Sequence, residues 1–216
     1  MPTLEDARDT YPTSAAWLAS RSELPHLLNQ RRLFGCGVEI GVQHGEFSEA
    51  ILDAWRGRHL ISVDPWLTDV ADQYVDIANV SQTQHNALHE ETKQRLSRFG
   101  SRSSVWRMTS LEAIPHIPDY SLDFVYIDAR HDYESVMEDL NAWHPKVRPG
   151  GVLAGHDYID GHFSAGIFGV KRAVDEFFGA RGVSVYPTLL DTPWLTWITV
   201  AALPEAAVEG ASAVPA

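Results

Sequence analysis

The chain has 216 residues, 44% of them hydrophobic, with a formal net charge of -12 at pH 7 and a single cysteine, Cys36. This length suits one α/β domain, and the negative charge argues against nucleic acid or an anionic membrane as the main partner. One cysteine excludes an intramolecular disulfide and a cysteine-based zinc cluster, and no apolar run reaches about 18 residues, so we expect a cytoplasmic protein that binds a small molecule.

Residues 1–34 have the spacing of a helical lead-in, with Thr13 or Ser14 as its cap. Such a segment either covers the open side of an active site or packs on the sheet edge, and the sequence leaves both alternatives open. The apolar surface of the lead-in also makes a homodimer an expectation. Its apolar contacts are expected from Trp17, Leu18, Leu24, Leu27 and Leu28.

Residues 38–48 predict a short buried strand, a turn with Gly41 and Gly45, and the start of a helix. A residue without Cβ lets a ligand approach the backbone closely, although such glycines also occur for turn geometry alone. The third glycine of a dinucleotide-binding turn is missing. Glu39 at the strand end suits a cationic nucleoside without phosphates, for which S-adenosylmethionine is the common example.

A second strand, residues 60–63, ends on Asp64. An acid at this point, about 20 residues after the glycines, is the usual partner of a ribose diol. The connection that follows, residues 65–103, is longer than a crossover helix needs, so we expect an insertion that shapes a substrate pocket. Its polar stretch from 81 to 99 carries His85 and His89, which we interpret as a solvated helix face rather than metal ligands.

Three further strands are expected at 104–108, 122–127 and 152–155. Ser110 follows the first of them and is predicted to lie near the adenine. The other two deliver polar residues to the edge of the sheet that carries the glycine turn. These are Asp128 with His131, and His156 with Asp157.

The remaining chain predicts a loop at 159–169, a helix beginning near Val170, and two strands near 183–186 and 194–201. Residues 204–216 have the composition of a flexible tail. Together these elements predict one α/β domain over residues 35–203, with a Rossmann-like doubly wound sheet and helices on both faces.

The order of these motifs resembles the class I S-adenosylmethionine-dependent methyltransferases. Residues 126–133 (YIDARHDY) and 149–158 (PGGVLAGHDY) are similar to the small family that groups macrolide-sugar O-methyltransferases with cephalosporin-type methyltransferases of secondary metabolism. The resemblance covers roughly residues 35 to 180. It implies a seven-stranded, mostly parallel sheet whose last strand is antiparallel.

The resemblance also assigns roles to the cofactor residues. Glu39, Gly41 and Gly45 match the turn that binds S-adenosylmethionine, and Asp64 matches the acid that binds the ribose. Asp128 is expected at the same edge of the sheet as this turn, and hydrogen bonding to the methionine end of the cofactor is the alternative to a catalytic role for it.

Within the motifs at 126–133 and 149–158, Asp128 and Asp157 match carboxylates that bind Mg²⁺ in metal-dependent relatives. His131 matches the histidine proposed as general base. His156 stands where those relatives place an acid. The expected metal ligands are therefore Asp128, His156 and Asp157, and an imidazole among them favours Mn²⁺ over Mg²⁺. Alternatively, His131 caps the following helix and His156 is a core histidine.

The expected activity is the S-adenosylmethionine-dependent O-methylation of a small molecule, a sugar or a natural-product scaffold, with or without a divalent metal. A positioned base or a bound cation is required because an alcohol has a pKa far above 7. The alternatives are an N-methyltransferase, which needs neither, and a cofactor-binding protein without transferase activity. An NAD(P)-dependent oxidoreductase is disfavoured by the missing glycine.

Overall fold

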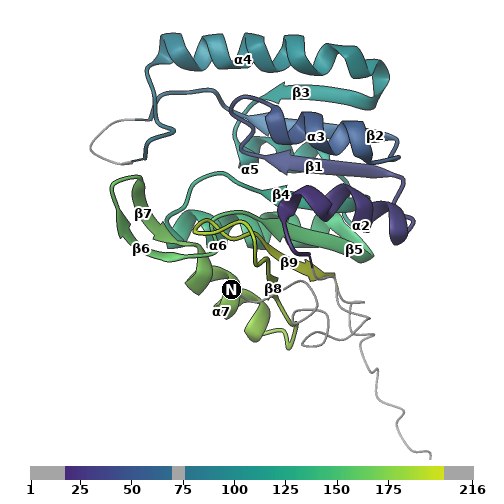
Figure 1. Ribbon diagram of the computed structural model, residues 1–216, viewed down its shortest axis with the longest axis vertical. Coiled ribbons are helices and arrows are strands. Elements are labelled where there is room, and N and C mark those ends of the chain that lie inside the picture. The colour runs from purple at the N-terminus through teal and green to yellow at the C-terminus, as the bar shows by residue number, and fades with distance from the viewer. Residues whose placement is uncertain (1–17, 70–75, 202–216) are drawn as a thin grey trace, which may run out of the picture.

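The computed structural model describes residues 18–69 and 76–201. Its seven-stranded sheet has the order β3-β2-β1-β4-β5-β9-β8 (Figure 1). The first five strands pair in parallel, and β9 pairs antiparallel with β5, which confirms the predicted fold class. The strands are β1 (Cys36–Ile40), β2 (His59–Asp64), β3 (Ser103–Arg107), β4 (Leu122–Ile127), β5 (Val147–Gly155), β8 (Tyr186–Pro187) and β9 (Trp197–Val200).

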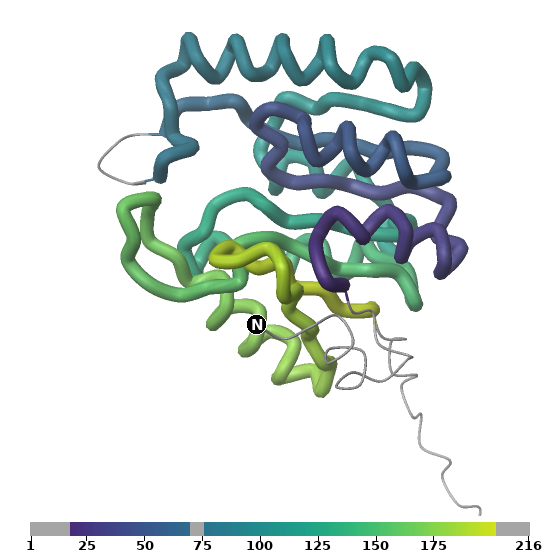
Figure 2. The backbone as a smooth tube through the Cα atoms, in the orientation of Figure 1, coloured from purple at the N-terminus to yellow at the C-terminus, as the bar shows by residue number. Residues whose placement is uncertain are grey.

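Helices cover both faces of the sheet, as the ribbon and the tube both show (Figures 1 and 2). One face carries α2 (Leu24–Gln30), α3 (Glu46–Ala54) and the end of α4 (Gln82–Leu96). The other face carries α5 (Ser110–Ala113), α6 (Tyr133–Trp143) and α7 (Val170–Gly179). Short 3-10 turns are η1 (Arg21–Glu23), η2 (Ser97–Arg102), η3 (Ile114–His116) and η4 (His144–Lys146).

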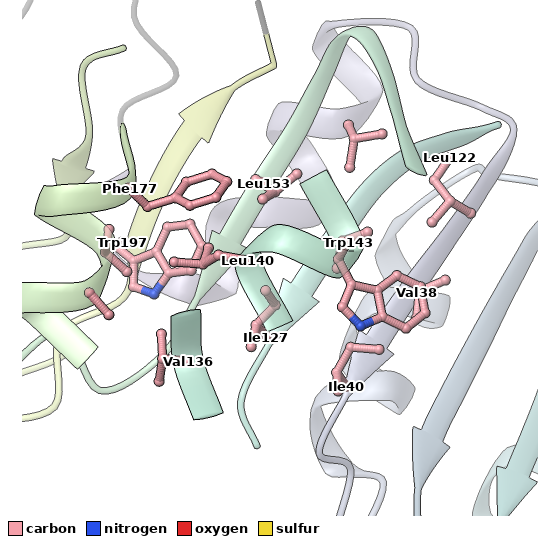
Figure 3. Packing of buried hydrophobic residues seen from close by; sticks show 14 of the residues in the cluster. Val38, Ile40, Leu122, Ile127, Val136, Leu140, Trp143, Leu153, Phe177 and Trp197 are labelled. Atoms are coloured by element: carbon pink, nitrogen blue, oxygen red, sulfur yellow. The ribbon is translucent and has the colours of Figure 1, made fainter. Parts of the chain in front are cut away.

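The alternation of side chains along β4 explains the two cores. All six residues of β4 are buried, because the strand is central and both of its faces are covered. Val125 and Ile127 belong to the core under α6 and α7, whereas Phe124 and Tyr126 belong to the core under α2 and α3. Figure 3 shows the first of these cores, where Trp143 lies beside Val38 and Ile40 and Trp197 lies near Phe177.

The described part of the lead-in packs on the sheet. Leu24 and Leu28 of α2 are buried in the core that also holds α3, so this helix covers one face of the sheet. The cap of η1 is Ser20, whose side chain accepts from the Ser22 amide. The predicted caps Thr13 and Ser14, and the predicted contact Trp17, lie outside the described residues.

The connection after β2 contains the predicted polar helix. Helix α4 begins with a capping box formed by Ser81 and Gln84, and it is the crossover element between β2 and β3 (Figure 1). Before it, Asp76 forms an isolated bridge with Gly166. The connection therefore contacts a segment about 90 residues further along the chain.

Two local predictions differ from the structure. The expected loop at 159–169 is an antiparallel hairpin of β6 (Asp160–Phe163) and β7 (Gly166–Gly169). The strand expected at 152–155 is longer: β5 starts at Val147 and includes the Pro-Gly-Gly sequence at 149–151 through a register shift against β4. Both segments are rich in glycine, which permits extended chains as well as turns. Within the described residues, no helix is both long and apolar enough to cross a membrane.

Candidate active site

A cavity of about 940 Å³ opens at the carboxyl ends of the parallel strands, a size typical of ligand pockets. Nearly all of the predicted site residues line this one cavity. They are Glu39, Gly41, Asp64, Ser110, Asp128, His131, His156 and Asp157. Gly45 is not among the described residues that line it. It caps α3 with a φ of 73°, and an added Cβ would lie 2.8 Å from Thr92.

The glycine turn after β1 is fixed by main-chain contacts. Gly41 has a φ of 80°, and its amide donates to the Val63 carbonyl at 2.9 Å. A Cβ on Gly41 would lie 1.9 Å from the backbone oxygen of Asp128. The missing side chain therefore lets the ends of β1 and β4 meet, which brings Asp128 next to the turn.

Asp64 is held at the end of β2 by backbone amides. Its Oδ2 accepts from the Val42 and Gln43 amides at 2.9 and 3.0 Å, and its Oδ1 accepts from the Trp66 amide at 2.6 Å. These bonds join the acid to the glycine turn. Its carboxylate lies at the end of β2 and lines the cavity, and the predicted contact with a ribose diol stays a prediction.

Glu39 is buried beneath α3. Its carboxyl accepts from the Ser48 hydroxyl, which also lies 2.6 Å from the Ser62 hydroxyl. Burial raises the pKa of Glu39 to about 8, although the Ser48 hydrogen bond lowers it. The nearby charges of Asp128 and Asp64 add to the increase, so a cation arriving in the cavity would favour the ionised form.

This pKa predicts a proton linkage. The folded protein holds a proton on Glu39 up to about pH 8, whereas the ordinary pKa is 4.5, so the free energy of unfolding falls as pH rises between these values. Binding of the cationic S-adenosylmethionine should release this proton, and its affinity should increase over the same pH range. Titration calorimetry at pH 7 in phosphate and in Tris is expected to reveal release of about one proton on binding. This release should be absent in Glu39→Gln. Equal binding heats for the wild type in both buffers would contradict the linkage.

Ser110 starts α5 at the carboxyl end of β3. Its hydroxyl donates to Asp139 of α6 and accepts from the Trp143 indole at 2.7 Å. Burial raises the pKa of Asp139 to about 6. The Ser110 hydroxyl is thus hydrogen-bonded to Asp139 and Trp143 of the protein itself. Its location near the adenine stays a prediction.

A cluster of acids and imidazoles lies at the ends of β4 and β5. One ligand atom from each of Asp128, His131 and Asp157 lies within 4.8 Å of the others, a spacing that could hold a metal ion. His131 Nε2 lies 2.9 Å from Asp157 Oδ2, and its Nδ1 lies 2.6 Å from Asp76 Oδ2. Asp76 was not predicted from the sequence.

The imidazole of His131 is enclosed. Its ring stacks on Phe168 with 4.6 Å between centroids and an interplanar angle of 15°. Burial would lower the pKa of His131, but the contacts with Asp157 and Asp76 outweigh it and raise this pKa to about 10. Despite the short contact with Asp157, the buried Nε2 lacks the geometry of a hydrogen bond to any described residue. His131 therefore holds a proton in this geometry, and its Nε2 faces Asp157 as an ion pair.

His156 lies on the other side of the same carboxylates. Its Nδ1 is 3.1 Å from Asp157 Oδ1 and 3.8 Å from Asp128 Oδ2. Burial would lower the pKa of His156, but the bond to Asp157 and both negative charges raise it. Burial would raise the pKa of Asp157, yet His131 and His156 hold it below its usual range. The structure thus brings His131, rather than His156, into the three-residue group with metal-ligand spacing.

Two further residues of the cavity wall were not predicted from the sequence. Arg21 of the lead-in lies 3.8 Å from Asp128 Oδ2 and 5.1 Å above the Phe47 ring. His85 of α4, interpreted above as solvated, is only 8% exposed and lines the cavity. Nothing in the local sequence marks either of them, because both reach the site through tertiary packing.

This sheet order, the antiparallel β9, the glycine turn after β1 and the acid after β2 together define a class I S-adenosylmethionine-dependent methyltransferase. Residues 38–158, more than half of the chain, match the family model described as a methyltransferase domain. The chain therefore belongs to this family.

Solved structures with the same fold include two O-methyltransferases. TomG from Streptomyces achromogenes, solved with S-adenosylmethionine and involved in tomaymycin synthesis, is 19% identical with a TM-score of 0.59, over 90% of this chain and 85% of TomG. An O-methyltransferase from Bacillus cereus, solved with S-adenosylhomocysteine, is 14% identical with a TM-score of 0.56, over 90% of this chain and 86% of that one.

Two curated relatives are uncharacterised proteins. Protein y4gI of Sinorhizobium fredii is 28% identical over 134 residues, which is 62% of this chain and 14% of the relative. A protein of Acanthamoeba polyphaga mimivirus is 25% identical over 127 residues, 59% of this chain and 53% of the relative. The match thus spans about half of one relative and a seventh of the other.

Proposed function

We propose that this protein transfers a methyl group from S-adenosylmethionine to a hydroxyl of a small molecule, a sugar or a natural-product scaffold. The observation that carries the proposal is the shared cavity, in which the acid and imidazole cluster lies with the glycine turn and Asp64. An oxygen acceptor must lose a proton during transfer, and the cluster offers groups that can assist this loss. N-methylation has no need of such a cluster.

The donor set also fits a divalent ion. Two carboxylate oxygens and one imidazole nitrogen come together, and the buried His131 Nε2 has no hydrogen-bond partner among the described residues. Asp76 contacts the opposite ring nitrogen, as a carboxylate does behind many metal-bound histidines. An imidazole in the set favours Mn²⁺ over Mg²⁺. When bound, the ion would lower the pKa of an acceptor hydroxyl.

The residues of the chain have distinct parts in this proposal. Asp76 keeps Nδ1 of His131 engaged, so Nε2 is the atom that faces Asp128 and Asp157. The predicted role of His131 as general base requires a free, unprotonated nitrogen, and its raised pKa disfavours that role in this geometry. We propose His131 as the third ligand of the ion instead. A divalent cation between Asp128 and Asp157 would offset the negative charges that raise this pKa and would displace the proton from Nε2.

Aromatic side chains form a wall next to this cluster. Phe168 and Trp194 line the cavity with 5.1 Å between their ring centroids, and Phe163 packs edge-on against both. Catechols, which are planar, and the apolar C–H faces of pyranose sugars both pack on such rings. We propose this wall as the acceptor side of the site.

Chelation tests the metal. The protein is expected to bind S-adenosylhomocysteine in calorimetry with or without EDTA, and to methylate members of a panel of sugars and catechols. Methyl transfer should be lost after EDTA treatment and restored better by Mn²⁺ than by Mg²⁺. A rate that EDTA leaves unchanged would contradict the metal role. Failure to bind S-adenosylhomocysteine under either condition would overturn the proposed cofactor.

A further inference from the structure

His85 is a buried polar side chain whose two ring nitrogens lack partners. The residue lies in the first turns of α4, it is 8% exposed, and it lines the cavity. Neither Nδ1 nor Nε2 has a hydrogen-bond partner among the described residues. Buried polar atoms are nearly always paired in native proteins, so a doubly unpaired ring facing a cavity indicates a missing ligand.

The ring is uncharged near neutral pH. Burial lowers the pKa of His85, and the positive charge of Arg107 lowers it further against the opposing charge of Asp64. A neutral imidazole has one N–H donor and one acceptor nitrogen. This pair of functions matches a hydroxyl group or the edge of a purine, each of which also donates and accepts.

His85 lies on the side of the cavity that holds Asp64. Its neighbours on α4, Gln82 and Asn86, bond to the Trp66 carbonyl and to Arg107. The Trp66 amide in turn donates to Asp64. The charges that act on its ring are those of Asp64 and Arg107, from the carboxyl ends of β2 and β3. By contrast, the charges acting on His131 are those of Asp157, Asp76 and Asp128. The ring of His85 and the ring of His131 are therefore surrounded by different charged groups of the same cavity.

Helix α4 is fixed against the glycine turn, which holds His85 in place. The Thr92 hydroxyl and the Trp66 indole both donate to the Gln43 carbonyl, each at 2.9 Å. Trp66 itself is fully buried. A side chain presented by so rigid a support loses little freedom when a ligand binds.

We propose that His85 binds the adenosine half of the cofactor, with its ring hydrogen-bonded to the ribose or to the adenine edge. Asp64 complements this role, because its carboxylate can only accept hydrogen bonds and already accepts them from three backbone amides. The inference rests on the proposed function, since S-adenosylmethionine is the cofactor it assumes.

The matched test replaces His85 and His89 separately by Phe. His89 lies one turn further along α4 and packs at a tilt against Trp66, with 4.7 Å between ring centroids. It is not among the described residues that line the large cavity. His85→Phe keeps the ring volume and removes both nitrogens. It is expected to weaken binding of S-adenosylhomocysteine and of adenosine in calorimetry by the same factor, about 10-fold or more, whereas His89→Phe should change either affinity less than about twofold.

Thermal unfolding separates ligand binding from a structural role. His85→Phe should leave the Tm of the ligand-free protein equal or higher, because it removes two unpaired buried atoms, and should diminish the Tm increase that S-adenosylhomocysteine produces. The proposal is overturned if His85→Phe binds both ligands like the wild type, or if both variants weaken binding equally. A wild-type protein that binds neither ligand would instead overturn the proposed function.

Discussion

Asp157→Asn is expected to lower the rate of methyl transfer by roughly 10²- to 10⁴-fold while leaving the affinity for S-adenosylhomocysteine nearly unchanged. Asp157 contacts His131 Nε2 at 2.9 Å and His156 Nδ1 at 3.1 Å, so its negative charge organises both imidazoles. Asn keeps the shape of the side chain and removes the charge. It also tolerates the left-handed backbone of this position, where φ is 52°.

Asp119→Asn is the matched control for this substitution. Asp119 lies just before the amino end of β4, whereas the cavity is at the carboxyl ends of the strands. It forms an exposed ion pair with Lys146. Steady-state rates and calorimetry on both variants give the comparison. If Asp157→Asn retained the wild-type rate, the cluster would have no part in the chemistry, and if it lost cofactor affinity equally, the residue would belong to the cofactor subsite.

Gly41→Ala is expected to reduce the free energy of unfolding by about 2 to 4 kcal/mol, the sum of a strained backbone and an overpacked contact. The new Cβ would lie 1.9 Å from the Asp128 carbonyl oxygen, and φ at this position is 80°. Relief of this clash must separate the ends of β1 and β4. Affinity for S-adenosylhomocysteine should therefore decrease as well, because the turn and Asp128 no longer meet.

Gly150→Ala separates the two contributions. Gly150 has nearly the same φ, 78°, but an added Cβ would meet no atom within 4 Å. This variant should lose only about 1 kcal/mol, from the backbone conformation alone. Urea unfolding measures both variants. Equal losses would show that the close approach to Asp128 contributes nothing to stability.

The sequence predicted the residues that lie at strand ends. Asp64, Asp128 and Asp157 follow strands recognised by their apolar runs, and parallel strands bring such positions to one edge of the sheet. This rule needs only the order of the elements. The three acids do line one cavity.

The contacts that decide chemistry depended on packing instead. Asp76 meets His131 across 55 positions of sequence, from a connection without periodicity. Helix α4 has polar residues on all sides, so no apolar stripe indicated that His85 faces inward. The β6–β7 hairpin was missed because four-residue strands bounded by glycine have too little pattern to separate from a loop.

The register of β4 and β5 has a consequence for how such a protein can diversify. Ile127 lies opposite Gly155, and the His156 amide donates to the Ile127 carbonyl at 3.0 Å, so main-chain ladder bonds set the separation of Asp128 and Asp157. The proposed acceptor wall draws Phe163 and Phe168 from the hairpin instead. Changes in the hairpin sequence can thus alter which methyl-acceptor substrates fit the site, while the sheet keeps the spacing of Asp128 and Asp157 unchanged.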